Sequence, residues 1–443
     1  MLLQPRWSVP AQSDDDRQQR NAAGTPRRRQ EDCALLKSRG DLALPQSLPP
    51  AVVLSGNIMA LGVVRSLGMM GVPVAVAHFR DEDIAHVSRY VTENIRIPHP
   101  EEDEEGFLER LEAWASRYHG SLLIPASDEA LIAASRHKAR LEKHYTVACA
   151  EWPVVERFVD KRHTYALADL IGLPAPRTFV LGSIADVEKH GATVAYPCLL
   201  KPSQSHRYVD AFGRKLTSVE DMGELRTAFN EATERGLDVL LQELIPGDDT
   251  HGVNYNCYMQ DGEPLVEFTA QKLRLSPPGF GAPCAIVSRQ IPEVIEPGRR
   301  ILRALGFNGY ACVEFKRDAR DGVYKLMEVN GRVNLSLLLS VRCGINFAWL
   351  MYRHLVLGEL PKAQAYRSGV YWLEGAKDAY YGAIGIVSGR ISPGALLRPY
   401  VGPHVFAIAD LRDMRPALKR YGDYLRTGAR RLLSRLVPSR LIH

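Results

Sequence analysis

The chain has 443 residues, of which 46% are hydrophobic and 24% are charged, and its formal net charge at pH 7 is +5. This composition is typical of a globular protein with two or three packed domains, and it excludes a fibrous or wholly disordered chain. The modest net charge is weak support for nucleic-acid binding, so we expect no nucleic-acid partner. The seven cysteines are scattered without a C-x-x-C pair, and no apolar run approaches eighteen residues. These features predict a cytoplasmic protein without a disulfide framework, a structural zinc site, a secretory signal or a membrane-spanning helix.

The start of the chain differs from the rest. Residues 1–48 are polar, rich in Pro, Gln and Arg, and show no hydrophobic periodicity. Such a segment buries too little apolar surface to fold, so its composition predicts a disordered amino-terminal extension.

Residues 49–150 carry the pattern of a βαβ domain. The elements expected from hydrophobic periodicity are strand 52–54, turn 55–57, helix 58–70, strand 72–77, helix 104–118 and strand 122–125. Ser127 and Asp128 then begin another helix, and we interpret them as a cap rather than a ligand site. The turn Ser55-Gly-Asn57 lacks the G-x-G-x-x-G fingerprint, so the predicted Rossmann-like character is one of architecture only.

Residues 151–360 alternate helices with strands and then change to an antiparallel pattern. The expected elements are helix 160–171, strand 198–200, helix 222–235, strand 239–242, strands 253–259 and 264–275, and helix 296–305. Loop 276–283 is rich in Pro and Gly, and we interpret it as a candidate lid.

One β-hairpin at the end of this region brings two acids together. Residues 311–316 and 325–330 alternate with period two around a turn near Asp321, so Glu314 faces Glu328 and Asn330 shares their face. Two carboxylates about 5 Å apart would cost about 3 kcal/mol at an effective dielectric of about 20, so the pair needs solvent or a cation. A magnesium ion that completes its shell with nucleotide phosphates fits these donors. The alternative is a solvated polar face of an edge hairpin. The opposite face is expected to hold Val313, Phe315, Met327 and Val329.

The last region, residues 361–443, is a carboxyl-terminal extension that ends in a basic amphipathic pattern. Arginines populate most of the predicted helix surface, and one face is apolar, with Met414, Leu418, Tyr421, Leu425, Ala429, Leu432 and Leu436. We favour packing of this helix on protein, and peripheral contact with an anionic membrane surface is the alternative.

The order of several motifs along the chain carries a family resemblance. The motifs are Asp160-Lys161, Lys201-Pro202, Gln242-Glu243 with Pro246-Gly247, Glu314, and Glu328-Val-Asn-Gly-Arg332. This order resembles the ATP-grasp superfamily, and within it the carboxylate-amine ligase branch that includes D-aspartate ligases. The resemblance covers roughly residues 51–345. It implies a fold of mixed α/β and α+β class, with a pre-ATP-grasp βαβ domain followed by a two-lobed ATP-grasp fold with antiparallel sheets.

The resemblance also implies roles for individual residues. Lys161 and Lys201 match two phosphate-binding lysines, and Glu314, Glu328 and Asn330 match the metal ligands. The segment that joins the lobes and reads adenine is matched by Gln242, Glu243, Leu244 and Ile245. Asp248 or Asp249 is a candidate for the ribose hydroxyls, and a solvated loop acid is the alternative. Arg289 and Arg332 match cations that stabilise developing charge, although structural ion pairs are the alternative for both. Lys272 and Arg274, just before the candidate lid, suit an anionic substrate such as an acidic amino acid.

The implied reaction joins a small-molecule carboxylate to an amine. ATP with Mg²⁺, or Mn²⁺ as an alternative, would form an acyl phosphate that the amine then converts to an amide, releasing ADP and phosphate. The alternatives are a kinase-like phosphoryl transferase and a non-catalytic nucleotide-binding scaffold on a membrane or partner. A homodimer is left open. Two features depart from the family: residues 203–212 contain no glycine to cradle phosphates, and Gly331 stands where proline is common.

Overall fold

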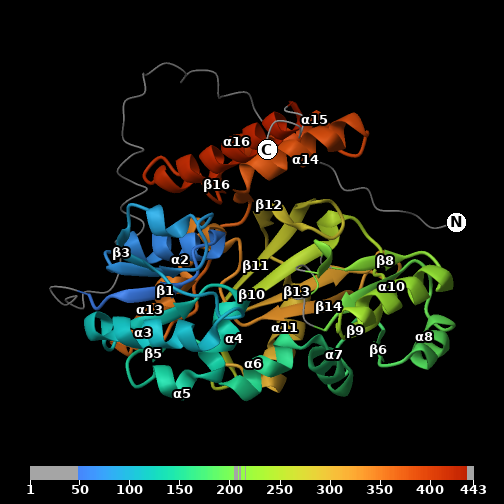
Figure 1. Cartoon of the computed structure of the whole chain (residues 1–443), viewed down its shortest axis with the longest axis horizontal. Coiled ribbons are helices and arrows are strands. Elements are labelled where there is room, and N and C mark those ends of the chain that lie inside the picture. The colour runs from blue at the N-terminus through green and yellow to red at the C-terminus, as the bar shows by residue number, and fades with distance from the viewer. Residues whose placement is uncertain (1–47, 204–207, 209–210, 215, 437–443) are drawn as a thin grey trace, which may run out of the picture. The chain divides into compact units, whose positions relative to one another are not determined.

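The computed structural model describes residues 48–436, except 204–207, 209, 210 and 215 (Figure 1). The predicted amino-terminal extension therefore lies outside the described residues, apart from Leu48. The described residues all belong to one of the two units into which the chain divides, Pro45–His443. In this described part, every cysteine is free and no helix combines the length and apolar character needed to cross a bilayer.

A five-stranded parallel sheet forms the first layer, with strand order β3-β2-β1-β4-β5. Its strands are β1 (Ala51–Leu54), β2 (Val74–His78), β3 (Val91–Arg96), β4 (Leu122–Pro125) and β5 (Thr146–Val147), and its helices are α2 (Ile58–Gly68), η1 (Ala85–Val87), α3 (Glu104–Tyr118), α4 (Asp128–Arg136) and α5 (Lys138–Leu141). All four residues of β1 are buried, because helices cover both faces of a parallel sheet. Asn57 caps α2 and Ser127 caps α4, as short polar side chains do at helix starts.

A smaller antiparallel sheet follows, with strand order β6-β9-β7-β8. It consists of β6 (Thr178–Leu181), β7 (Cys198–Pro202), β8 (Thr217–Val219) and β9 (Val239–Glu243), with α6 (Trp152–Val159) and α7 (Lys161–Leu170) before it and α8 (Ile184–Gly191) and α10 (Met222–Glu234) packed on it. Val187 of α8 and Leu225 of α10 share one apolar core with Leu200 of β7.

A larger sheet of seven strands has the order β14-β13-β10-β11-β12-β15-β16. Its elements are η2 (Asp249–His251), β10 (Gly252–Gln260), β11 (Glu263–Ser276), β12 (Ala282–Ser288), η3 (Pro292–Val294), α11 (Ile295–Leu305), β13 (Gly309–Arg317), β14 (Tyr324–Asn330), α12 (Leu337–Arg342), α13 (Phe347–Leu357), β15 (Tyr371–Leu373) and β16 (His404–Phe406). Helix α11 packs on one face, where Ile301 joins the core around Val253. On the other face Phe268 joins the core of the first domain.

The carboxyl-terminal helices form a further layer beyond β12 and β16 (Figure 1). They are α14 (Gly375–Val387), α15 (Pro393–Val401) and α16 (Arg415–Leu436). Helices α14 and α15 pack closely, since a Cβ atom at Gly382 would lie 2.4 Å from the Leu396 side chain. The predicted amphipathic helix is thus present as α16. Its Ala417 is buried against the body, whereas Leu418 and Leu425 are exposed.

Candidate nucleotide and metal site

The hairpin formed by β13 and β14 has the predicted register. Glu314 pairs directly with Glu328, and Cys312 pairs with Asn330, so both acids and the amide share one face. A register shift follows Glu314, and Phe315 pairs with Leu326 instead of Met327. Leu326, not Met327 as predicted, therefore enters the apolar core, because the shift leaves Met327 as an extra residue on its strand.

Each of the two acids is held by a lysine. Lys272 Nζ on β11 donates to Glu314, and Lys161 Nζ at the start of α7 lies 3.4 Å from Glu328 Oε1. The amide of Asn330 lies 3.5 Å from Glu314 Oε1. Burial acts to lower the pKa of Lys272, but the Glu314 carboxylate outweighs it and holds that pKa above its usual value. The repulsion expected between the facing acids is thus offset by cations from two other elements.

Lys201 and Lys316 complete a basic cluster around the acids. Burial and, to a smaller extent, the nearby charge of Lys161 lower the pKa of Lys201 to about 8, against the opposing effect of Glu328. Burial likewise lowers the pKa of Lys316. Four lysines and two glutamates give the cluster a net charge of +2 when every group is ionised. This charge complements a nucleotide–magnesium complex, which carries about two negative charges.

Sequence reasoning did not select Lys316. A signal was present, because Lys316 is two residues from Glu314 on the same strand and so shares its face.

Lys201 gives the site a pH dependence of defined sign. Its pKa of about 8 in the folded protein lies below the ordinary 10.5, so the folded chain loses this proton first. We expect nucleotide affinity to fall as the pH rises through about 8, because phosphates are held by the charged lysine. The free energy of unfolding should rise between about pH 8 and 10.5, because there the unfolded chain binds more protons. Calorimetric titration with Mg·ADP at several pH values measures the first effect.

The matched variant for this prediction is Lys201→Arg, whose guanidinium stays charged across the range. Its nucleotide affinity should be nearly independent of pH between about 7 and 9. An affinity profile that is the same in the variant and in the original chain would contradict the assignment to Lys201.

The donor set fits a hard divalent cation. Glu314, Glu328 and Asn330 offer carboxylate and amide oxygens on one face, which are the ligands that Mg²⁺ accepts. The described residues contain no group of three or more His, Cys, Asp or Glu that could hold a metal by themselves. Mg²⁺ in nucleotide sites has one or two protein carboxylates and takes its other ligands from phosphates and water, so two acids are sufficient.

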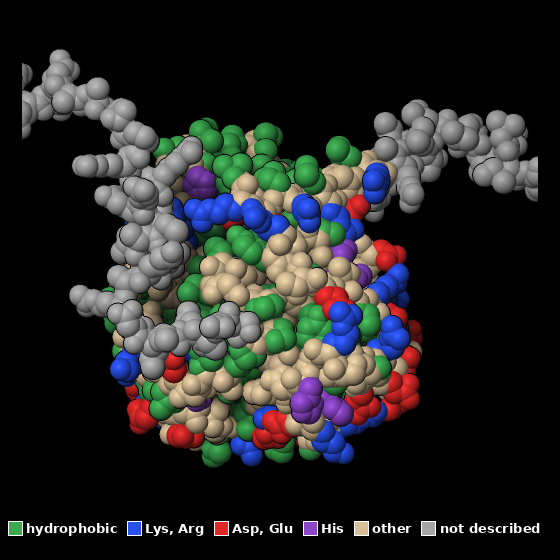
Figure 2. Space-filling view, turned by 90° about the vertical axis from the view of Figure 1, so that its left-hand side faces the viewer, with side chains coloured by type: hydrophobic (Ala, Val, Ile, Leu, Met, Phe, Trp, Pro, Cys, Tyr) green, Lys and Arg blue, Asp and Glu red, His purple; other side chains and the backbone are tan. Residues whose placement is uncertain are grey.

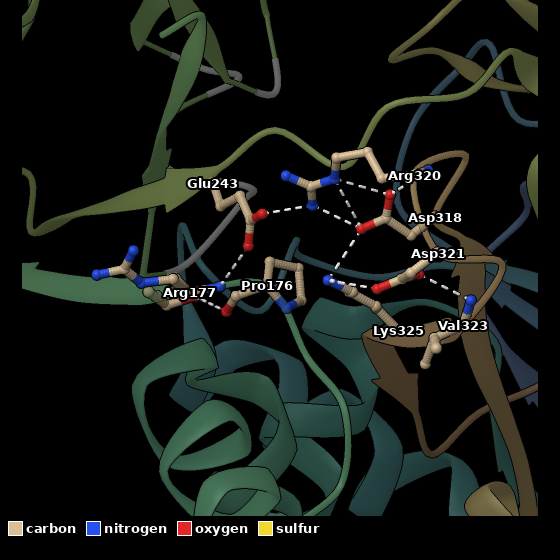
Figure 3. A network of polar contacts seen from close by, with 9 residues as sticks. Pro176, Arg177, Glu243, Asp318, Arg320, Asp321, Val323 and Lys325 are labelled. Carbon is tan, nitrogen blue, oxygen red and sulfur yellow. Dashed lines mark hydrogen bonds and ion pairs between the residues drawn. The ribbon is translucent and has the colours of Figure 1, made fainter. Parts of the chain in front are cut away.

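Glu243 lies at the end of β9 and connects the two antiparallel sheets (Figure 3). It accepts a hydrogen bond from Arg177 N at 3.1 Å and another from the guanidinium of Arg320, in the turn between β13 and β14. Arg320 also binds the buried Asp318, and Lys325 Nζ lies 2.9 Å from Asp318. The Arg320 and Lys325 contacts keep the pKa of Asp318 low, despite its burial. Glu243 thus joins the two antiparallel sheets, and its place in the segment expected to read adenine stays a prediction.

The other residues expected to contact the nucleoside lie near this junction. Gln242 is fully buried in β9, where its amide donates to Thr178 Oγ1 at 2.9 Å, and Ile245 is buried just after the strand, beside Leu244. Asp249 accepts from Leu275 N at 2.8 Å and from Gly279 N at 2.9 Å. Asp249 therefore fixes the turn between β11 and β12, which is the candidate lid.

The two arginines predicted to stabilise developing charge lie in different surroundings. Arg289 donates to Gln271, which alternates with Lys272 on β11 and so lies on the opposite face of the sheet from Glu314. The structure does not bring Arg289 to the acids. Arg332 forms a two-pronged ion pair with Asp128, with both distances 2.8 Å, and ties the hairpin to the first domain.

Two further expectations concern the surroundings of the site. Arg274 is paired with the buried Asp378, so it does not offer a free cation to an anionic substrate. Most of the glycine-free segment 203–212, namely residues 204–207, 209 and 210, lies outside the described residues.

Comparison with known proteins places this geometry in context. Residues 284–375 match the family model described as "ATP-grasp in the biosynthetic pathway with Ter operon". Over 319 residues the chain is 24% identical to a D-aspartate ligase of Enterococcus faecium, covering 67% of this chain and 74% of that protein. Over 216 residues it is 26% identical to a D-alanine–D-alanine ligase of Ectopseudomonas mendocina, covering 46% of this chain and 64% of that protein. The chain thus spans less than two thirds of the second relative.

Solved structures show the same fold at low identity. The L-amino acid ligase from Bacillus licheniformis is 18% identical with a TM-score of 0.56, over 70% of this chain and 75% of that chain. The biotin carboxylase domain of the Hydrogenobacter thermophilus 2-oxoglutarate carboxylase was solved with MgADP. It is 20% identical with a TM-score of 0.56, over 72% of this chain and 73% of that chain. The predicted fold, a βαβ domain followed by two antiparallel lobes, is confirmed.

Proposed function

We propose a reaction for this chain, which belongs to the ATP-grasp superfamily and is an ATP-dependent ligase of its carboxylate-amine branch. It joins a small-molecule carboxylate to a small-molecule amine through an acyl phosphate, and releases ADP and phosphate. The observation that carries the proposal is the facing pair Glu314 and Glu328, each held by a lysine from a different element. This arrangement has the donors and the charge for a nucleotide with its metal.

The residues of the cluster divide the work of binding and charge neutralisation. Glu314, Glu328 and Asn330 would hold Mg²⁺, which when bound neutralises charge on the phosphates and acts as a Lewis acid. Lys161 and Lys201 bind the phosphates and follow the charge as it moves to the leaving ADP. Lys272 and Lys316 lie on the same face and offset the negative charge of the two acids before the nucleotide and its metal bind. No protein nucleophile is needed, because the reaction depends on positioning and electrostatics.

Other contacts hold the cluster in place. Glu243 and Arg320 join the two sheets at the end of β9, and Arg332 with Asp128 joins the hairpin to the first domain. Rigid support of this kind keeps reacting groups aligned, which is a large part of catalysis by positioning. We therefore assign Arg332 and Glu243 to positioning, and leave Arg289 out of the reaction.

Amino acids are the substrates that we propose for both positions. The support is the similarity to a D-aspartate ligase and to D-alanine–D-alanine ligases. The free cysteines agree with the cytoplasmic location included in this proposal. Mn²⁺ as an alternative metal and a homodimer remain part of the proposal.

The proposal predicts that ADP release depends on two substrates together. Purified protein with Mg·ATP is incubated with amino acids singly and in pairs, and ADP is measured with the amide product. We expect one carboxylate–amine pair to raise ADP release at least about 10-fold over either partner alone, with one amide formed per ADP. ADP release that needs only one substrate, with a phosphorylated product, would instead indicate a kinase-like transferase.

A further inference from the structure

The carboxyl-terminal layer exposes an unusual amount of apolar surface. Seventeen large apolar side chains are exposed in the described part of the chain, and ten of them lie within residues 380–425. These ten are Tyr380, Ile384, Val387, Leu397, Val401, Leu411, Met414, Leu418, Tyr424 and Leu425. Scattered exposed apolar residues are normal, but a concentration on one layer marks an interaction surface.

Several of these side chains are almost fully accessible. Val387 at the end of α14 is 91% exposed, Val401 at the end of α15 is 87% exposed, and Leu411 in the following loop is 95% exposed. They come from three separate segments, so the exposure does not belong to a single frayed end. Figure 2 shows apolar side chains gathered over this end of the molecule, with a row of Lys and Arg directly beneath them.

The charge of the same layer has one sign. Within residues 375–426, all of which the structure describes, six basic residues are exposed: Lys377, Arg390, Arg398, Arg412, Arg415 and Arg426. Over the same residues, no Asp or Glu is exposed. Asp378 and Asp413 are buried in ion pairs with Arg274 and Arg65. Two further acids of the layer are only partly exposed, Asp423 beside Lys419 and Asp410, which accepts from Arg412 N.

We infer that this layer, α14, α15 and the exposed face of α16 with its preceding loop, docks on an anionic lipid bilayer. An apolar surface bordered by cations, without exposed acids, matches the acyl and headgroup regions of an anionic leaflet. Exposed Tyr380 and Tyr424 add side chains that favour the membrane–water interface. No described helix has the length and apolar character to span a bilayer, so the contact is peripheral. The sequence suggested α16 alone, whereas the structure adds α14 and α15.

Flotation of the full chain with vesicles tests the inference. The protein should bind vesicles of phosphatidylcholine with phosphatidylglycerol about 10-fold or more better than phosphatidylcholine alone. Binding should weaken as salt is raised from about 0.1 M to about 0.5 M, because salt screens the cationic border. Equal partition onto both vesicle types, or no binding to either, would overturn the inference.

Two sets of variants separate the apolar from the charged contribution. Val387→Ser, Val401→Ser and Leu411→Ser together should lower vesicle partition by about 10-fold or more. The matched control is Leu170→Ser, Val180→Ser and Leu360→Ser, which changes exposed apolar residues outside the layer and should leave partition unchanged. Arg390→Gln, Arg398→Gln, Arg412→Gln and Arg415→Gln together should remove the preference for the anionic lipid.

A second copy of the chain is the alternative partner for this surface. Light scattering shows whether the surface joins two copies. It is measured for the original chain and for the variant that carries Val387→Ser, Val401→Ser and Leu411→Ser together. A dimer that dissociates in this variant, with vesicle binding unchanged, would overturn the inference in favour of a second copy. ADP release with small substrates should be the same in all variants, since none of these residues lies in the nucleotide cluster.

Discussion

Glu328→Gln is expected to lower kcat/KM for Mg·ATP-dependent ADP release by about 100-fold or more. The substitution keeps the shape of the side chain and removes its charge, so one of two carboxylates for the metal is lost. Lys161, which lies 3.4 Å from Glu328, also loses its anionic partner, and the cluster gains positive charge. Steady-state ADP release at saturating substrate pairs measures the effect.

The matched control for this variant is Glu263→Gln, which changes an exposed glutamate at the start of β11 in the same sheet. Its kcat/KM should stay within about twofold of the original chain, as for other surface substitutions. Thermal unfolding should be similar in both variants, because Glu328 is not part of an apolar core. If Glu328→Gln turned over ATP as fast as the control, the metal assignment would be wrong.

Asp413→Ala is expected to lower the free energy of unfolding by about 3–5 kcal/mol. Asp413 accepts from Arg65 Nε at 2.9 Å, from Ser88 Oγ at 2.7 Å and from Arg89 N at 2.8 Å. The side chains of the ion pair are 1% and 0% exposed, so removal of the carboxylate leaves the Arg65 charge buried without its anion. Urea unfolding followed by fluorescence measures the change.

Asp423→Ala provides the comparison for this pair. Asp423 lies 3.1 Å from Lys419 on α16, and both side chains are partly exposed to solvent. Removal of a solvated pair of this kind should cost about 0–1 kcal/mol. Similar losses of stability in the two variants would mean that the Arg65–Asp413 pair does not anchor the carboxyl-terminal layer to α2.

The hairpin could be predicted from the sequence because its information is local. Period-two alternation on both sides of a short turn determines which residues face each other, and Glu314 does pair with Glu328. The register shift was missed because Leu326 and Met327 are both apolar, and either could fill the core. Lys316 was missed for a different reason, since a lysine on an alternating strand is equally typical of a solvated face.

The placement of Arg289 and Glu243 could not be read from the sequence. Arg289 reaches the face opposite Glu314 through pairing between β11 and β12, which sequence spacing does not encode. Glu243 meets Arg320 across a separation of 77 residues. The strands β15 and β16 are three residues each and pair in parallel although they are distant in sequence, so periodicity had too few residues to detect them.

The carboxyl-terminal layer shows a limit of amphipathic patterns. The pattern predicted the helix α16, but periodicity does not say whether an apolar face is covered by protein. In the structure Ala417 is buried and Leu418 and Leu425 are not, because only one side of the helix meets the body. The exposed side therefore joins α14 and α15 in a common surface, which could be recognised only after the three helices were placed.

Calorimetric titration of the full chain with AMPPNP, with and without Mg²⁺, tests the central claim most directly. We predict one nucleotide bound per chain, about 10-fold or more tighter with Mg²⁺, and loss of this gain in Glu328→Gln. A chain that does not bind Mg·AMPPNP, or a variant that keeps the full gain from Mg²⁺, would contradict the proposal that Glu314 and Glu328 form a metal–nucleotide site.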